Sequence, residues 1–331
     1  MIRTNAVSIK IPSNHRDESP FIMPRFNLYG ALITAKHTTI PCCNRIVSGR
    51  AEVNRTRRWA LLMMAIMVVS LTPTVTSSTT VVVWSGIVNL PDGAVIDDDQ
   101  VVQVQPGTEI RIGEGESIDV DGRLSVLGTE NQQVTVNSID GKHDGIHFTS
   151  VSRGLGSSIS HLKIENASRG IIIVDSDPMM NNITVLNADF VSVDLFSSAN
   201  PQITNLTILG GGQDVHGISG TWRYGIGLSL GSGSAPLVNG FLADSLVTRA
   251  LNVWGGSGGV ISDLSITNVS GATLAVSSGI WVEDSVLLIS DTEIEKSDNG
   301  IFVRHISEGF TTLSLIHISE PTRPRLISYA V

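Results

Sequence analysis

The feature that most constrains this chain is a repeat that begins with the stretch SSISHLKIENASRGIIIVDS, residues 157–176. Its first half, an apolar residue followed by x-x-Leu-x-Ile-x-Asn, returns with changed residues at four later positions, which are Ile183, Ile203, Leu237 and Ile261. Its second half, Gly-Ile-x-Val, returns at steps of 20 to 35 residues. Repeats of this length indicate a solenoid, in which each unit buries its apolar residues only by stacking on its neighbours.

Short runs of alternating apolar residues make up each copy, and Gly, Asn or Ser separates the runs. Such alternation is typical of β-strands, whose successive side chains point to opposite faces. In the stretch 157–176 it predicts that Leu162, Ile164, Ile171 and Ile173 point inward. The equivalents of Ile171 in the other copies are expected to be Ile146, Val191, Ile226, Leu251, Ile280 and Ile301. The sequence therefore predicts an all-β fold, a parallel β-helix that forms a single elongated domain.

The repeats are expected over residues 139–312, and residues 79–138 are expected to form the N-terminal cap and the first coils. Short apolar runs in residues 79–138 are separated by turn pairs such as Pro106-Gly107 and Asp121-Gly122. A solenoid needs a cap because its first coil otherwise exposes unpaired strand edges.

A secretory signal or membrane anchor is expected at residues 53–78. Residues 55–58 supply three arginines before the largely apolar run of residues 59–71, and small polar residues follow. The run is short for a membrane span, which favours a cleaved signal and a secreted or cell-surface protein. Residues 1–52 show no recognisable period and are expected to be an unstructured, mis-annotated leader, with a genuine long leader as the alternative.

Charge and cysteine usage separate the leader from the rest. Both cysteines, Cys42 and Cys43, lie in the leader, so the exported part cannot contain a disulfide. Residues 59–312 hold 10 Lys and Arg against 27 Asp and Glu. Such an acidic surface argues against nucleic acid or anionic membrane as a partner. Contact with a membrane is expected only through the apolar segment 59–71.

The last segment, residues 313–331, reads LSLIHISEPTRPRLISYAV and departs from the repeat. It resembles the in-frame translation of a sequencing adapter, and we expect it to be non-native. The alternative is a genuine tail in which Pro321 and Pro324 end the last coil.

Over about residues 100–305, the repeated GI-x-V and I-x-x-L-x-I-x-N units resemble secreted proteins of the pectin-lyase-like superfamily in the broad sense. The resemblance implies a right-handed parallel β-helix. These motifs are specific for fold and weak for function.

Outward-facing positions of the second half would form one row along the solenoid, namely His147, Ile172, Ser192, Gly227, Asn252, Trp281 and Phe302. Trp281 and Phe302 would then lie about 5 Å apart, the spacing of neighbouring strands. Aromatic faces can stack on sugar rings, so this pair and His147 are candidates for carbohydrate binding. The alternative is that another segment covers the two rings.

Asn166, Asn187 and Asn268 occupy equivalent corners in IEN, VLN and ITN. The fold implied by the resemblance often carries an amide ladder at such bends, which satisfies backbone groups, and we expect these residues to form one. Asn166 and Asn268 also lie in N-x-S/T sequons, as do Asn182 and Asn205, a weak signal for glycosylation.

The longest repeat contains GGGQDVHGISGTWRYG, residues 210–225, which is expected to project as a loop. Loops on rigid scaffolds often carry function, and this one holds five candidate binding or acid/base residues. They are Asp214, His216, Trp222, Arg223 and Tyr224. The alternative is an insertion without a binding role, whose aromatic residues only pack the loop against the rest of the protein.

No catalytic residues, metal site or cofactor motif can be assigned from the sequence. The Asn-Thr-Asp and Gly-His-Gly motifs of β-helix hydrolases are absent. We therefore expect a noncatalytic surface, adhesion or glycan-binding module, whose partner is an extracellular glycan or a cell-surface component. One alternative is a truncated polysaccharide lyase, for which calcium would be the cofactor, or a truncated glycoside hydrolase. Another is a structural stalk for a further C-terminal domain.

The predicted export signal can be tested on the native protein. Cleavage is expected near residues 76–78, so mass spectrometry of the mature protein should detect no peptide from residues 1–50. Peptides from that region in the native protein would contradict the mis-annotated leader.

Overall fold

A computed structural model describes residues 79–212, 224–272 and 276–304 with their side chains, and the backbone of residues 7–10, 312–319 and 327–330. Residue contacts divide the chain into two units, residues 16–77 and the remainder. The first unit lies outside the described residues, as does the expected signal. Among the residues that are described, no helix has the length and apolar character needed to cross a membrane.

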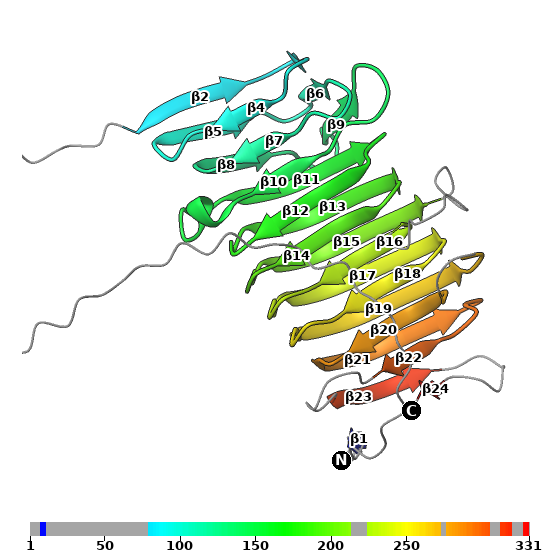
Figure 1. Cartoon of the computed structure of the whole chain (residues 1–331). Helices are drawn as coiled ribbons and strands as arrows, with labels where there is room; N and C mark the ends of the chain where they lie inside the picture. Colours follow the sequence, from blue (N-terminus) through cyan, green and yellow to red (C-terminus); the bar gives the residue numbers. More distant parts are fainter. Residues whose placement is uncertain are drawn as a thin grey trace, which may run out of the picture. The chain divides into compact units, whose positions relative to one another are not determined.

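Two sheets of stacked strands contain nearly all of the described chain (Figure 1). Sheet A consists of β1 (Val7–Lys10), β2 (Thr80–Trp84), β3 (Ile87–Leu90), β5 (Gln100–Val104), β6 (Glu109–Ile112), β8 (Arg123–Leu127), β9 (Val134–Ser138), β11 (Ser158–Glu165), β13 (Met179–Ala188), β15 (Gln202–Gly211), β17 (Leu237–Leu246), β19 (Val260–Val269), β21 (Val286–Glu295) and β23 (Thr312–Ser319). Sheet B consists of β4 (Ala94–Ile96), β7 (Ile118–Val120), β10 (Ile146–Phe148), β12 (Arg169–Val174), β14 (Val191–Phe196), β16 (Ile226–Leu230), β18 (Arg249–Val253), β20 (Ser278–Glu283), β22 (Ile301–Arg304) and β24 (Ile327–Ala330). One short 3-10 helix, η1 (Ser150–Ser152), follows β10.

Successive coils pair in parallel within each sheet, as β11 does with β13 and β12 with β14. Among the strands that the structure describes, only β1 pairs antiparallel, with β23. A chain that leaves a strand and returns to a parallel neighbour almost always crosses over with a right hand. The predicted right-handed parallel β-helix is confirmed. Residues 80–148 already form complete coils, each with two strands in sheet A and one in sheet B.

Each later coil has three sides because its strand in sheet A is bent. The bend residue has a positive φ and is His161, Asn182, Asn205, Gly240, Asp263 or Asp291. In the earlier coils the two halves are separate strands, and β8 and β9 both pair with β11. We call the half before the bend face A1 and the half after it face A2. Sheet B forms the third side.

The core is the stack of inward side chains. Leu162, Ile164, Ile171 and Ile173 are all at most 1% exposed and belong to the core cluster, as the alternation predicts. Ile172 is buried too, but it lies outside that cluster, on the outer side of sheet B. The predicted inward and outward alternation of this stretch is therefore confirmed.

A row of small residues stands where the chain enters sheet B. A Cβ atom at Gly170 would lie 2.3 Å from the carbonyl oxygen of Ser192 in the next coil. At Gly227 the corresponding distance to the carbonyl of Ala250 would be 2.5 Å. Real Cβ atoms do not approach that closely, so the Gly of the Gly-Ile-x-Val unit lets the coils reach hydrogen-bonding distance.

The strand register shows that two of the residues predicted for the outward row were assigned wrongly. Ile171 pairs with Val193, and Val193 pairs with Leu228, so Val191 and Ile226 are not the equivalents of Ile171. The outward partners of Ile172 are accordingly Asp194 and Ser229, not Ser192 and Gly227. A shift of two residues keeps the strand's alternation, so the sequence pattern could not reveal it.

Residues 312–319 and 327–330 continue the stack as β23 and β24, which pair in parallel with β21 and β22. The departure from the repeat in this segment does not prevent strand formation, because its apolar residues still alternate with polar ones. Its origin as an adapter sequence stays a prediction.

Replacing Gly170 by Ala tests the close approach between coils. The new methyl group would contact the Ser192 carbonyl, and such overpacking costs about 1–3 kcal/mol of unfolding free energy. Ser192→Ala is the matched control, because Ser192 occupies the same corner one coil later. Its buried hydroxyl has no hydrogen-bond partner among the described residues, so its loss breaks no hydrogen bond and should not destabilise the fold. Denaturant titration measures both values, and equal stability of the two variants would contradict this role of Gly170.

Candidate functional site

The outer side of sheet B carries a continuous row of side chains, one from each strand from β7 to β22. In order along the solenoid, the register joins Asp119, His147, Ile172, Asp194, Ser229, Asn252, Trp281 and Phe302. Neighbouring members are about 4.8 Å apart, the spacing of paired strands. The row is accessible at Asp119 and His147, and buried from Ile172 to Trp281. Its two parts have different chemistry.

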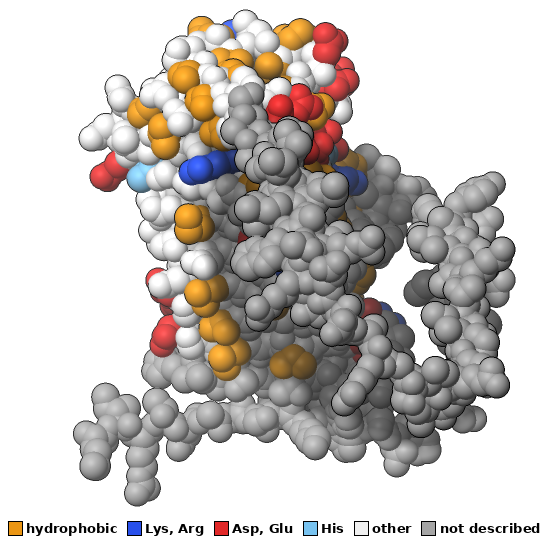
Figure 2. Space-filling model, turned by 90° about the vertical axis from the view of Figure 1, so that its left-hand side faces the viewer, with side chains coloured by type: hydrophobic (Ala, Val, Ile, Leu, Met, Phe, Trp, Pro, Cys, Tyr) orange, Lys and Arg blue, Asp and Glu red, His pale blue; other side chains and the backbone are white. Residues whose placement is uncertain are grey.

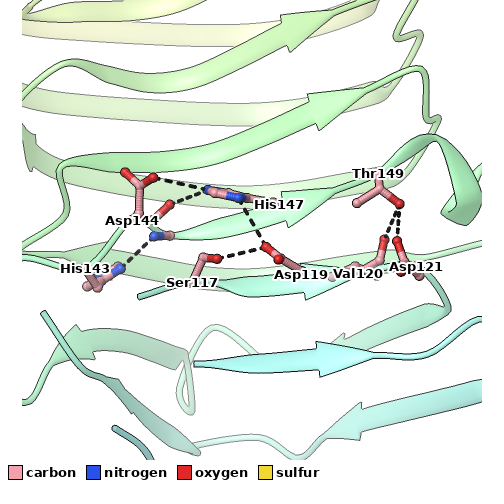
Figure 3. A network of polar contacts seen from close by, with 9 residues as sticks. Ser117, Asp119, Val120, Asp121, His143, Asp144, His147 and Thr149 are labelled. Atoms are coloured by element: carbon pink, nitrogen blue, oxygen red, sulfur yellow. Dashed lines mark hydrogen bonds and ion pairs between the residues drawn. The ribbon is translucent and has the colours of Figure 1, made fainter. Parts of the chain in front are cut away.

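His147 lies between two carboxylates at the accessible end (Figure 3). Its Nδ1 is 3.2 Å from Oδ1 of Asp119, and its Nε2 is 2.7 Å from the backbone carbonyl of Asp144. Ser117 donates its hydroxyl to the same Asp119 oxygen at 2.8 Å. The side chains of Asp119 and Asp144 remain 45% and 30% exposed.

Both ring nitrogens of His147 therefore face oxygen acceptors of the protein. Each of these oxygens can accept a hydrogen bond from a ring N–H. In this arrangement the ring offers no free nitrogen to take a proton from a substrate. The carboxylates, by contrast, keep exposed lone pairs that accept hydrogen bonds.

Trp281, at the other end of the row, has both ring faces covered. Phe302 stacks on one side, with ring centroids 4.2 Å apart and planes 16° apart. The guanidinium carbon of Arg249 lies 3.8 Å from the ring centroid of Trp281, a cation–π contact. Trp281 is 5% exposed and donates its ring N–H to Glu283 at 3.2 Å. The predicted adjacency of the two aromatic rings is observed, but a sugar ring could stack on Trp281 only after Arg249 or Phe302 moved.

Between the two ends, buried polar side chains are linked to one another. Arg249 donates to the Asn252 carbonyl oxygen at 2.6 Å, and Asn252 donates to the Ser229 hydroxyl at 3.3 Å. Asp194 is buried at the next position of the row. Buried polar groups require partners, so this network fixes the outer side of sheet B in one arrangement. The sequence analysis missed Asp194 and Ser229, which only the register brings into the row.

Of the five loop candidates, Asp214, His216, Trp222 and Arg223 lie outside the described residues. Tyr224 is fully buried and clusters with Val247, against which Phe190 and Ala272 pack. It therefore anchors the end of the loop. A binding role of the loop stays a prediction.

Asn166, Asn187 and Asn268 all stand at the second bend of their coils, with φ between 52° and 55°. Asn166 donates to Asn137 and Asn268 donates to Asp244, each in the preceding coil. Gly210 and Ser245 occupy the coils between Asn187 and Asn268, so the three asparagines do not form one continuous ladder. Hydrogen bonds from Thr267, Asn268 and Ser245 lower the pKa of Asp244.

A longer ladder that the sequence did not predict stands at the first bend. Asn205 donates to the Asn182 carbonyl oxygen at 2.9 Å, and the Asn182 amide nitrogen lies 3.0 Å from Nε2 of His161. Nδ1 of His161 is 2.9 Å from the Ser160 hydroxyl. The sequons at Asn182 and Asn205 were the only sequence signal at these positions.

Ser160, His161 and Asn182 superficially resemble a nucleophile, a base and an orienting amide. Because Asn205 occupies the Asn182 oxygen, the Asn182 N–H faces Nε2 of His161 and makes that nitrogen the acceptor. The proton of the neutral ring then sits on Nδ1, which donates to Ser160 instead of accepting its proton. The cluster thus works as a structural ladder, not as an activated serine.

His143 is fully buried beside the His147 cluster. Its Nδ1 accepts the Gly145 N–H at 3.0 Å, and its Nε2 donates to the Glu165 carbonyl at 2.9 Å. Burial lowers the pKa of His143 below its usual value of 6.5, while the Glu165 carbonyl and Asp144 act in the opposite direction. The neutral ring therefore links the corner that precedes His147 to the next coil.

Within the described ranges, no three His, Cys, Asp or Glu side chains are grouped so that they could hold a metal ion. Calcium binding, which the lyase alternative requires, is not tested by this result.

No family model and no curated protein matches this chain. Among solved structures, it is similar to the crystal structure of an alginate lyase from Paenibacillus sp. str. FPU-7. The sequence identity is 13% and the TM-score 0.28, over 62% of this chain and 91% of that chain. A likeness of this size assigns neither family nor function, and the fold assignment rests on the strand pairing itself.

His143 makes stability depend on pH in a defined direction. Its folded pKa lies below 6.5, so the unfolded chain binds the proton more tightly. The contribution of the neutral ring is fully present above pH 6.5 and is lost as the pH falls below that value. The melting temperature should therefore fall between pH 7.5 and 5.5. His143→Gln, which can keep both hydrogen bonds without titrating, should show a smaller fall, and an equal fall in both proteins would contradict the assignment.

Proposed function

We propose that this protein is exported and binds glycans without cleaving them, through the outer side of sheet B. The observation that carries the proposal is the accessible cluster of Asp119, His147 and Asp144. It presents exposed carboxylate oxygens at the open end of a long, rigid row, while the imidazole between them is engaged at both nitrogens. Rigid placement of a few polar groups is what a binding site for a hydroxyl-rich ligand needs.

A neutral glycan fits this cluster better than an acidic one. Carboxylates accept hydrogen bonds from sugar hydroxyls, and charge-assisted bonds of this kind are stronger than neutral ones. A uronate would bring its own negative charge beside Asp119 and Asp144, in a region where acidic residues outnumber basic ones 27 to 10 over residues 59–312. The like-charge repulsion disfavours alginate-type or pectin-type ligands.

A polysaccharide lyase or glycoside hydrolase is the second candidate function. The contact between Nδ1 of His147 and Asp119 favours it, since a carboxylate orients the imidazole in many general-base pairs. Catalysis would require Nε2 of His147 to leave the Asp144 carbonyl when substrate binds. The two functions therefore differ in what His147 does.

Asp119→Asn and Asp144→Asn test the binding function. Each loses a charged acceptor but keeps its shape, so affinity for a neutral oligosaccharide should fall about tenfold, which equals 1.4 kcal/mol. Asp98→Asn is the matched control, because Asp98 is exposed on a turn before β5. Glycan arrays followed by titration calorimetry measure the affinities. Unchanged binding by both site variants would contradict the proposal, and no binding by the wild type would leave the structural stalk as the function.

Product release from neutral and acidic polysaccharides, with and without calcium, separates binding from catalysis. A protein that only binds glycans should release no products, so none are expected from the wild type. Products that disappear in His147→Gln would instead establish the lyase or hydrolase.

A further inference from the structure

We propose that face A1 is a second, separate binding surface, which takes an extended uncharged polysaccharide chain lying along the solenoid axis. From β11 to β21 this face has two outward rows. The first consists of Ser158, Met179, Gln202, Leu237, Val260 and Leu288. The second consists of Ser160, Asn181, Thr204, Asn239, Ser262 and Ser290.

None of these outward residues is charged, and none is buried. Surfaces of soluble proteins usually carry charged residues at about 25–35% of positions. The outward positions of face A2 in the same strands follow this rule and include Lys163, Glu165, Asp244, Glu293 and Glu295. The absence of charge is therefore a property of face A1, in a protein whose net charge is −9.

The first row is largely apolar and open to solvent. Met179, Leu237 and Val260 are 54%, 53% and 41% exposed. Figure 2 shows a file of hydrophobic side chains running along one side of the molecule. Exposed apolar side chains gathered in one file offer a surface on which the C–H groups of a ligand can pack.

Amides and hydroxyls make up the second row. Asn181, Thr204 and Asn239 are exposed, and their side chains make no hydrogen bond with any described residue. Each of these groups can both donate and accept, as the hydroxyls of a neutral sugar do. An extended glycan would place its C–H surface on the first row and its hydroxyls on the second. Asp263 and Asp291 are charged residues at the bend beside the second row, where face A1 ends.

The size of the face favours a narrow ligand over a protein. Six strands span about 24 Å at the usual strand spacing, and three residues along each strand span about 10 Å. The resulting area, roughly 240 Å², is far below the ~800 Å² that each partner buries in a stable protein complex. A single linear polymer can use such a strip because its contacts repeat along the axis.

Asn181→Asp with Asn239→Asp places two carboxylates on face A1 without changing side-chain shape. Binding a neutral chain would then require their desolvation, so affinity should fall at least about tenfold. The probes are insoluble cellulose and soluble glucomannan, with alginate as the acidic comparison. Thr184→Asp with Ser265→Asp adds the same charge to face A2 and should bind like the wild type. Circular dichroism and melting temperature confirm that all variants fold.

Polymer binding by a variant of the sheet B site tests whether face A1 binds independently of that site. Asp119→Asn with Asp144→Asn should retain binding to the long polymers while losing short oligosaccharides. Equal polymer binding by the wild type and by Asn181→Asp/Asn239→Asp would overturn the proposal, as would failure of the wild type to bind either neutral polymer. Loss of polymer binding in the face A2 control to the same extent would overturn it too.

Discussion

Every other feature of this protein depends on backbone hydrogen bonds between one coil and the next. A coil has no apolar partner of its own, and Ile171 is buried only because Ile146 and Val193 lie directly before and after it in the stack. The corner at Gly170 shows how tightly the stacking is constrained, since even a methyl group there would collide with the next coil. Stability and the positions of the functional groups therefore arise from the same contacts.

Stacking also turns single outward residues into rows. On sheet B the row joins an accessible acidic cluster around His147 to a closed network that ends in Arg249, Trp281 and Phe302. Face A1 carries uncharged rows on the same scaffold. A solenoid can vary the chemistry of each side independently, because inward and outward positions alternate along every strand.

Much of the fold was predictable from the sequence, because alternation and the recurring Gly-Ile-x-Val unit report directly on strand geometry. Ile164 and Ile173 follow from this pattern. The pattern did not show that Asp194, and not Ser192, belongs to the outward row, because a shift of two residues leaves the alternation unchanged. The covering of Trp281 by Arg249 and the tautomer of His161 depend on distances between side chains of different coils. The sequence alone does not give these distances.

A disulfide between neighbouring coils tests the strand register, since both proposed surfaces exist only if the coils align in this register. In a Cys42→Ser/Cys43→Ser background, Thr204→Cys/Asn239→Cys joins paired positions on face A1. Paired strands lie about 4.8 Å apart, within the usual Cα range of disulfides, about 4.4–6.8 Å. Val238 points inward, so Thr204→Cys/Val238→Cys should not form the bond. Under mild oxidation, mass spectrometry should find the disulfide in the first protein alone. Its formation only in the second would contradict the register and both surfaces with it.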